Sequence, residues 1–257
     1  MNPFSLAGKK GLVVGIANDR SIAYGCARSF VEEGAELAIT YLNEKAEPYV
    51  RPLAEKLNAK IILPCDVTES GELEAVFDEI RERWGELDFL VHAIAYADKD
   101  DLHGRVVDCS EEGFAKAMSV SCHSFLRMTR LAEPLMKNGG SLLTLTFYGS
   151  EKVVEGYGIM GPIKAALESC VKYAAAELSP QAIRVNALSL GPIQTRAASG
   201  IPGFEELMKS LVTRSFYGKA VTIEEVGNVA VHMVSDASVS TTGSIYFVDG
   251  GFHNSSW

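Results

Sequence analysis

The sequence lacks several features that mark particular classes of protein. It contains no apolar run long enough to span a bilayer, and its start, MNPFSLAGKK, has no long apolar core of the kind found in signal peptides. The five cysteines are odd in number and scattered, with no CxxC pair, and the five histidines form no HxxxH or HxH set. This pattern favours reduced thiols in a cytoplasmic protein, and it gives no sign of a disulfide framework or a metal site.

Basic residues are also fewer than acidic ones. The 257 residues include 24 Lys and Arg against 33 Asp and Glu, which gives a formal net charge of −9. This balance argues against sequence-independent binding to nucleic acid or to anionic lipid. With 47% hydrophobic and 22% charged residues, the composition is typical of a globular protein, and the length is near the upper size of a single α/β domain.

Short apolar runs alternate with longer amphipathic segments along the chain. Seven runs without polar alternation are predicted as buried strands, at 11–17, 36–41, 60–67, 87–95, 141–149, 183–193 and 244–251. Helices are predicted at about 22–33, 44–57, 70–84 and 111–136, and in the segment that ends near Leu178. Such a pattern predicts one α/β domain, with a Rossmann-like, doubly wound, seven-stranded parallel sheet and helices on both faces.

The stretch 194–221 breaks this rhythm. It is a long excursion with Gly200, Pro202 and Gly203, and it directly follows a predicted strand. Ligands of open α/β sheets bind beyond the carboxyl ends of the strands, so this insertion is a candidate cover for a substrate site. A plain surface elaboration is the alternative.

The turn after the first strand has features of a dinucleotide-phosphate site, although a GxGxxG motif is absent. Gly15 permits a sharp turn, and Ser21 is placed to cap the helix that begins at Ile22. Free N–H groups at that helix start, together with the helix dipole, suit a pyrophosphate. The motif alone is weak, because a glycine and a helix cap mark any strand-to-helix turn.

Further strand ends are expected at the same edge of the sheet. Asp66 can accept a hydrogen bond from an adenine amino group with Val67 as an apolar wall, or it can simply cap a turn ahead of Thr68. After the second strand, an acidic residue would hold a ribose diol and an arginine would favour the extra phosphate of NADP. The chain has the residues YLNEK at 41–45, so Glu44 favours NADH while Lys45 leaves NADPH open.

Tyr157 and Lys164 lie seven residues apart with Pro162 between them. Seven residues make two helical turns, so side chains at this spacing share one face of a helix. We expect the helix to begin between Tyr157 and Pro162, which puts the proline in the first turn, where its missing N–H costs little. Lys164 would then reach back toward Tyr157. A packed tyrosine and a solvated lysine are the ordinary alternative.

These segments together resemble the enoyl-acyl-carrier-protein reductases, a divergent branch of the short-chain dehydrogenase/reductases. The resemblance covers nearly the whole chain. It rests on the motifs G-x5-SIAYG (15–25), EGAELAxTY (33–41), CDV (65–67), Y-x6-K (157–164), RVNALSxGPI-x-T-x-AASGI (184–201), TIEEVGN (222–228) and VDGGF (248–252). A Tyr–Lys spacing of seven, with SIA in place of a glycine cluster, is typical of this branch.

The resemblance implies hydride transfer from NADH, or from NADPH, to C3 of a trans-2-enoyl thioester of acyl-carrier protein or coenzyme A, the last reductive step of fatty-acid elongation. Tyr157 would donate a hydrogen bond to the thioester oxygen as negative charge develops there, and Lys164 would bind the nicotinamide ribose. The other implied cofactor contacts are Gly15, Ser21, Ile22, Leu42, Asp66, Val67, Ile94, Ile193 and Thr195, and the implied substrate contact is Ala97. The resemblance implies a homotetramer, and it matches 197–208 to a substrate-covering loop.

Two positions depart from the family's pattern. Phe147 stands where a second tyrosine is usual, and Leu42 replaces a polar residue. Tyr148 could supply the missing hydroxyl only if the strand has already ended, because neighbours on a strand point to opposite faces. Two alternatives therefore stay open: a short-chain reductase acting on a ketone or another enoyl thioester, and a weakly catalytic cofactor-binding homologue, which Phe147 would favour.

Overall fold

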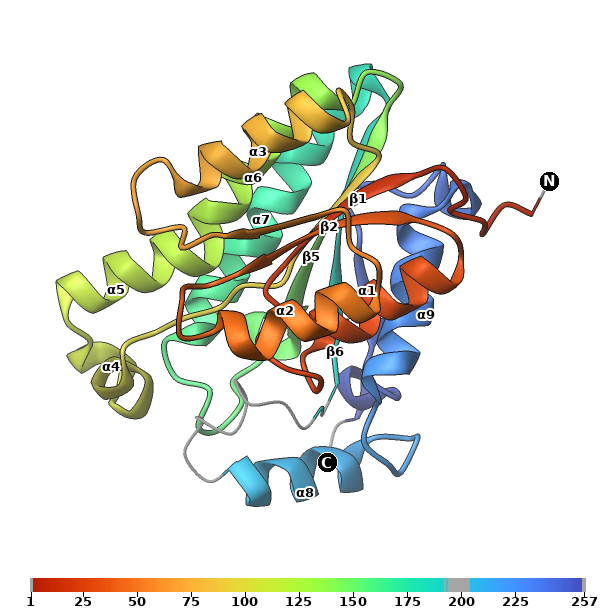
Figure 1. Cartoon of the computed structure of the whole chain (residues 1–257). Coiled ribbons are helices and arrows are strands. Elements are labelled where there is room, and N and C mark those ends of the chain that lie inside the picture. Colours follow the sequence, from red (N-terminus) through yellow and green to blue (C-terminus); the bar gives the residue numbers. More distant parts are fainter. Residues whose placement is uncertain (1, 192, 194–203, 256–257) are drawn as a thin grey trace.

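A single parallel sheet of seven strands forms the centre of the protein (Figure 1). The computed structural model describes residues 2–191, 193 and 204–255. The strands lie in the order β3-β2-β1-β4-β5-β6-β7. They are β1 (Lys10–Val14), β2 (Glu36–Tyr41), β3 (Ile61–Pro64), β4 (Phe89–His92), β5 (Gly140–Phe147), β6 (Ile183–Leu190) and β7 (Ile245–Val248). The predicted doubly wound parallel sheet is confirmed.

The strands are apolar throughout because helices cover both faces of the sheet (Figure 1). On one face lie α1 (Ile22–Glu32), α2 (Glu47–Lys56) and α9 (Ile223–Val234), and on the other lie α3 (Glu72–Arg83), α6 (Ser124–Ala132) and α7 (Met160–Leu178). Two buried clusters match these layers, one containing Phe30 and Phe89 and the other Phe77 and Phe125. Pro64 is the last residue of β3, which is an edge strand of the sheet. Proline has no backbone N–H, and at this edge position no hydrogen bond inside the sheet is lost.

The helix predicted at 111–136 is instead interrupted. α5 (Glu111–Met118) leads into a π-helical turn, η2 (Ser119–His123), which α6 follows directly before the 3-10 turn η3 (Glu133–Leu135). A π turn accommodates one extra residue in a helix and is frequent near functional sites. Ser121 in this turn and Ser124, the first residue of α6, are both buried and make hydrogen bonds.

Three α-helices of the described residues were not among the sequence predictions. α4 (Lys99–His103) is short, and α8 (Phe204–Arg214) lies apart from the other helices, near the end of β6 (Figure 1). The third, α9, begins with a capping box in which Thr222 Oγ1 accepts from the Glu225 N–H at 3.1 Å and Glu225 Oε2 accepts from the Thr222 N–H at 2.8 Å. The Thr-x-x-Glu pattern ahead of an apolar run was the signal that could have found it.

The domain organisation stays a prediction. Of the insertion predicted at 194–221, residues 194–203 lie outside the described part of the chain, and the next residues form α8. Over the described residues, every helix is too short or too polar to cross a bilayer. All five cysteines are free thiols.

Gly25 allows α1 to press directly against α9. A Cβ atom at Gly25 would lie 2.3 Å from the carbonyl oxygen of Ile223. Helix propensity alone would make Gly25→Ala stabilising by about 1 kcal/mol, but the clash with backbone must move one of the two helices. We therefore expect a loss of about 3 kcal/mol in the free energy of unfolding, measured by urea denaturation. Glu32→Ala, at an exposed position of the same helix, should stay within about 0.5 kcal/mol of the parent; a stabilised Gly25→Ala would contradict this packing.

Candidate active site

The turns after β1 and β4 meet at the point where the strand order reverses. Gly15 has a φ of +115°, and a Cβ there would lie 2.2 Å from the carbonyl oxygen of Ala93. Only glycine fits, because the conformation is left-handed and the neighbouring backbone is so close. In sheets with this strand order, dinucleotides bind across the crevice at that reversal. The predicted sharp turn at Gly15 therefore lies where a dinucleotide site is expected.

Ser21 precedes α1 as predicted, but its side chain does not cap the helix. Its Oγ instead accepts hydrogen bonds from the N–H groups of Ala17 and Asn18, at 3.0 Å each. The serine thus folds the loop after β1 back on itself. The N–H groups of Ile22 and Ala23 donate to no acceptor within the described residues, so they are available to an anion at the positive end of the helix dipole. This arrangement fits a pyrophosphate.

The residues predicted around the adenosine differ in exposure. Leu42 is 53% exposed directly after β2, whereas Val67 is buried. Asp66 makes the turn contact given as its alternative, because its Oδ1 accepts from the N–H and the hydroxyl of Thr68 at 2.9 and 2.7 Å. Its Oδ2 makes no hydrogen bond with a described residue. Asp66 therefore keeps one oxygen for a ligand while the other holds the turn.

A residue of the π turn holds the loop after β4 by hydrogen bonds. Ser121 Oγ accepts from the Tyr96 N–H at 2.8 Å and donates to the Tyr96 carbonyl at 2.9 Å. Ile94 and Ala97, on either side of Tyr96, are half-buried against the core. The predicted ribose and substrate contacts therefore lie on a loop whose backbone is held by Ser121, a residue that the sequence prediction missed.

Tyr157 lies in the turn that leads into α7, and Pro162 is the third residue of that helix, as predicted. The Tyr157 ring packs edge-to-face on Phe147, with ring centroids 4.7 Å apart. The hydroxyl makes no hydrogen bond with a described residue. Burial, together with the charge of Glu168, raises the pKa of this hydroxyl well above its ordinary value, so it remains a proton donor at neutral pH.

Phe147 thus occupies the place beside Tyr157 that the family's second tyrosine would fill. β5 ends at Phe147, so the condition for Tyr148 to turn toward Tyr157 is met. The Tyr148 ring nevertheless packs against Phe252 and His253 of the C-terminal segment, with centroid separations of 5.7 and 6.2 Å. The Tyr148 ring therefore lies against the C-terminal segment, and Tyr148 does not supply a second hydroxyl beside Tyr157.

Lys164 is buried, which contradicts the alternative of a solvated lysine. Its Nζ donates to the carbonyl oxygen of Leu145 on β5 at 2.8 Å. Burial lowers the pKa of this ammonium to about 8, and the charge of Glu168 opposes that fall. Tyr157 and Lys164 therefore both flank the carboxyl end of β5, although no hydrogen bond joins the two side chains in the described structure.

The remaining predicted contacts lie after β6. Ile193 is buried in the cluster on the α1 and α9 face. Thr195 and most of the segment matched to a substrate-covering loop, residues 197–203, lie outside the described residues.

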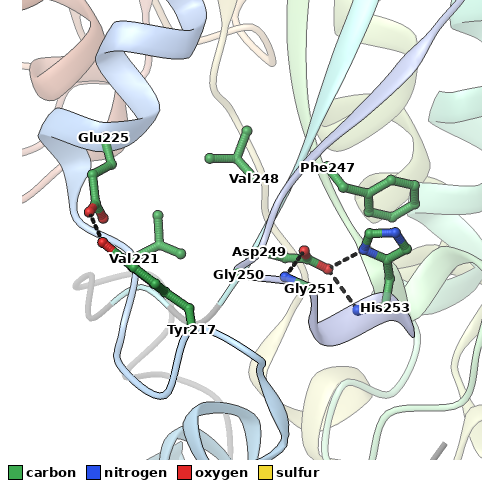
Figure 2. Close-up of a pocket in the computed structure, with 9 residues that line it drawn as sticks. All are labelled: Tyr217, Val221, Glu225, Phe247, Val248, Asp249, Gly250, Gly251 and His253. Atoms are coloured by element: carbon green, nitrogen blue, oxygen red, sulfur yellow. Dashed lines mark hydrogen bonds and ion pairs between the residues drawn. The ribbon is translucent and has the colours of Figure 1, made fainter. Parts of the chain in front are cut away.

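A separate pocket of about 320 Å³ lies at the carboxyl end of β7 (Figure 2). None of the predicted site residues lines this pocket. Asp249 is its buried charge, and it accepts from the N–H groups of Gly251 and His253 and binds His253 Nδ1 at 2.8 Å. These bonds close the turn after β7. Within the described chain, no three His, Cys, Asp or Glu side chains come together as metal ligands.

The strand order and the crevice at its reversal define a dinucleotide-binding α/β protein, and comparison with known proteins specifies the family. A sequence model for Enoyl-(Acyl carrier protein) reductase matches residues 15–253. The enoyl-(acyl-carrier-protein) reductase (NADH) 1 of Rhizobium meliloti strain 1021 is 47% identical over 246 residues, which cover 96% of this chain and 90% of that protein. The chain therefore belongs to the enoyl-(acyl carrier protein) reductase family, and the resemblance predicted from the sequence is confirmed.

Solved structures agree with this assignment. The enoyl-(acyl-carrier-protein) reductase of Anaplasma phagocytophilum in complex with NAD is similar with a TM-score of 0.94 and 46% identity, covering 98% of this chain and 96% of that one. The enzyme of Bacillus cereus with NADP+ and indole naphthyridinone is similar with a TM-score of 0.95 and 43% identity, covering 98% and 99%.

His92 is a buried residue of this region that the sequence prediction did not single out as a polar group. Its Nδ1 lies 2.9 Å from Thr144 Oγ1 on β5, and its Nε2 lies 2.8 Å from Ser124 Oγ on α6. Burial lowers the pKa of His92 to about 3 from its ordinary value of 6.5. The imidazole is therefore neutral in the folded protein and ties β4 to β5 and α6.

This neutral imidazole makes stability depend on pH. The unfolded chain binds a proton at His92 below about pH 6.5, whereas the folded chain does not until about pH 3, so the stabilisation is lost as pH falls through this range. We expect His92→Gln to be less stable at pH 7 but to lose about 2 kcal/mol less than the parent between pH 7 and pH 5. Urea unfolding at both pH values measures this, with the exposed His123→Gln as the control; equal pH dependence in parent and His92→Gln would contradict a neutral His92.

Proposed function

We propose that this protein reduces the C2=C3 double bond of trans-2-enoyl thioesters with hydride from NADH, the last reductive step of fatty-acid elongation. The observation that carries the proposal is the pairing at the start of α7. A phenol kept protonated and a buried ammonium flank the same strand end, in a chain that belongs to the enoyl-(acyl carrier protein) reductase family. Both groups are donors, and a thioester enolate requires donors.

The residues present fit a dinucleotide. In this proposal the free N–H groups of Ile22 and Ala23 bind the pyrophosphate, beside the close turn at Gly15. Val67 and Asp66 line the adenosine site with Leu42, while Ile94, Ile193 and Thr195 contact the inner ribose, the carboxamide and the phosphates. The cofactor supplies the hydride when it is bound.

The two donors have separate tasks. The Lys164 ammonium binds the hydroxyls of the nicotinamide ribose and places a positive charge near the reacting carbonyl. The Tyr157 hydroxyl donates to the thioester oxygen, where negative charge is greater in the transition state than in the substrate. Its raised pKa keeps it protonated, so it stabilises this charge by hydrogen bonding. Ala97 presents its backbone to the substrate.

NADH is the proposed cofactor, with NADPH as the alternative. Leu42 and Glu44 are exposed directly after β2, where an apolar and an acidic side chain offer nothing to an extra phosphate. Lys45 is exposed at the same turn. The Rhizobium meliloti relative is named for NADH, and the Bacillus cereus relative was solved with NADP+. Assays with both cofactors decide the matter.

We also propose that the protein is a cytoplasmic homotetramer that acts on acyl-carrier-protein or coenzyme A thioesters. The strand β7 supports assembly, since it exposes 45% of the surface of Tyr246 and, among the described residues, no strand pairs with its outer edge. Free cysteines suit the cytoplasm. The alternative of a weakly catalytic homologue rests on Phe147, which leaves Tyr157 without a second hydroxyl beside it.

A spectrophotometric assay tests the function. Purified protein, NADH or NADPH, and a trans-2-enoyl thioester should give a loss of reduced-cofactor absorbance that depends on the thioester. Consumption with a ketone alone would instead support a different short-chain reductase. Cofactor binding without consumption would support the weakly catalytic homologue.

Tyr157→Phe should separate catalysis from cofactor binding. It removes only the hydroxyl, so turnover of the enoyl thioester should fall roughly 100- to 1000-fold, the usual effect of losing one donor to a developing oxyanion. The dissociation constant for NADH, measured by fluorescence titration, should change little. If NADH affinity collapsed in parallel with turnover, Tyr157 would belong to the cofactor site.

Lys164→Ala should give the opposite pattern. Loss of the ammonium removes a proposed contact with the ribose, so NADH affinity itself should fall, by roughly tenfold or more for a buried charged hydrogen bond. Lys172→Ala, at an exposed position of the same helix, is the matched control. Wild-type NADH affinity in Lys164→Ala would contradict the assignment.

A further inference from the structure

Glu168 is a buried carboxylate to which the function proposed above assigns no part. It lies on α7, four residues after Lys164, so both side chains lie on one face of the helix. Only 6% of its surface is exposed. Acidic residues are almost never buried to this extent unless their charge has partners. The partners of Glu168 therefore indicate what it does.

Two hydroxyl groups donate to the same oxygen of this carboxylate. Thr146 Oγ1, on β5, lies 2.6 Å from Glu168 Oε1, and Ser150 Oγ, in the turn η4 (Tyr148–Ser150), lies 2.5 Å from it. Phe147 lies between these donors in sequence, and its ring is the one that packs on Tyr157. Glu168 therefore fastens the corner between β5 and η4 to α7, and with it the surface against which Tyr157 rests.

The charge of Glu168 also acts on both donors of the site. It adds to burial in raising the pKa of the Tyr157 hydroxyl, and it opposes the fall in the pKa of Lys164 that burial causes. Without that opposition, Lys164 would lose its proton at a lower pH. Both effects keep the two groups in their donating forms.

The other titratable groups that face Lys164 do not provide this charge. His92 on β4 is neutral because burial lowers its pKa to about 3, and Cys122 in η2 stays a thiol because burial raises its pKa to about 12. The Tyr157 hydroxyl, ahead of α7, is neutral as well. None of these three groups therefore supplies a negative charge to Lys164.

We propose that Glu168 is a positioning residue for the reaction. Its carboxylate is the internal counter-charge that keeps Lys164 an ammonium, and it holds the Phe147 corner in place against Tyr157. The inference rests on the proposed function, in which these two residues bind the cofactor and the substrate.

The test is the pH dependence of NADH binding in Glu168→Gln. The amide keeps the shape of the side chain and an oxygen that can accept from both hydroxyls, but it removes the charge. NADH affinity of the parent, followed by fluorescence titration, should weaken above a midpoint near pH 8 as Lys164 loses its proton. Because the ammonium loses a favourable charge in the variant, that midpoint should move down by roughly 0.5 to 1 pH unit.

Two controls separate the charge from other effects. Glu177→Gln removes an exposed charge of the same helix and should leave the midpoint where it is. Lys164→Arg carries a guanidinium that does not lose its proton in this range, so Glu168→Gln on that background should cause no downward shift.

Thr146→Val removes one hydroxyl partner and keeps the carboxylate. It should lower enoyl-thioester turnover roughly 10- to 100-fold, because the corner beside Tyr157 is less well held, while the NADH midpoint does not fall. A downward shift as large as that of Glu168→Gln would mean that packing controls the midpoint, and it would overturn the proposal.

An unmoved midpoint in folded Glu168→Gln overturns the proposal directly. If that variant fails to fold by circular dichroism, Glu168→Asp takes its place, since it withdraws the charge by one methylene and should shift the midpoint down by a smaller amount; no shift in the folded Asp variant is equally decisive. The proposed function fails separately, if the parent oxidises no NADH with an enoyl thioester, because the midpoint is measured by binding.

Discussion

The hydrogen bond from the Lys164 ammonium to the Leu145 carbonyl is the contact on which the candidate site depends. A buried charge without partners is unstable, so this bond and the nearby carboxylate are conditions for keeping the lysine inside. The bond joins α7 to β5 near the carboxyl end of the strand. It therefore fixes how far α7 extends toward the crevice, and with it the position of Tyr157 just ahead of the helix.

Much of the fold followed from sequence pattern because helices on both faces require strands that are apolar throughout. β2 was predicted with its observed bounds, and the helix from Ile22 ends where Gly34 was expected to stop it. The prediction of one uninterrupted helix at 111–136 was wrong, because a single extra residue in a π turn leaves the apolar pattern nearly unchanged. α9 was not predicted, although the Thr-x-x-Glu pattern of its capping box is present in the sequence.

The candidate site was harder to predict than the fold. The Tyr157–Lys164 pairing was visible as spacing, and Pro162 indicated where the helix starts. The side chain of Ser21 could not be placed in the same way, because its oxygen can accept equally well from the helix or from the loop before it, and the loop prevailed. Glu168 was overlooked because a glutamate in a helix is ordinarily exposed, and only the packing of β5 on α7 reveals its burial.

The π turn at Ser119–His123 also determines how the chain can tolerate changes in length. A π turn holds one more residue than the α turn it replaces, so deleting one residue there would restore a regular helix and leave α6 in nearly its present orientation relative to α5. Ser124 would still face His92, and Arg127 the Val67 carbonyl that it now reaches at 2.7 Å. Such a deletion would instead remove the widened turn that places Ser121 against the Tyr96 backbone, so the extra residue serves the loop after β4 and not the helix beyond it.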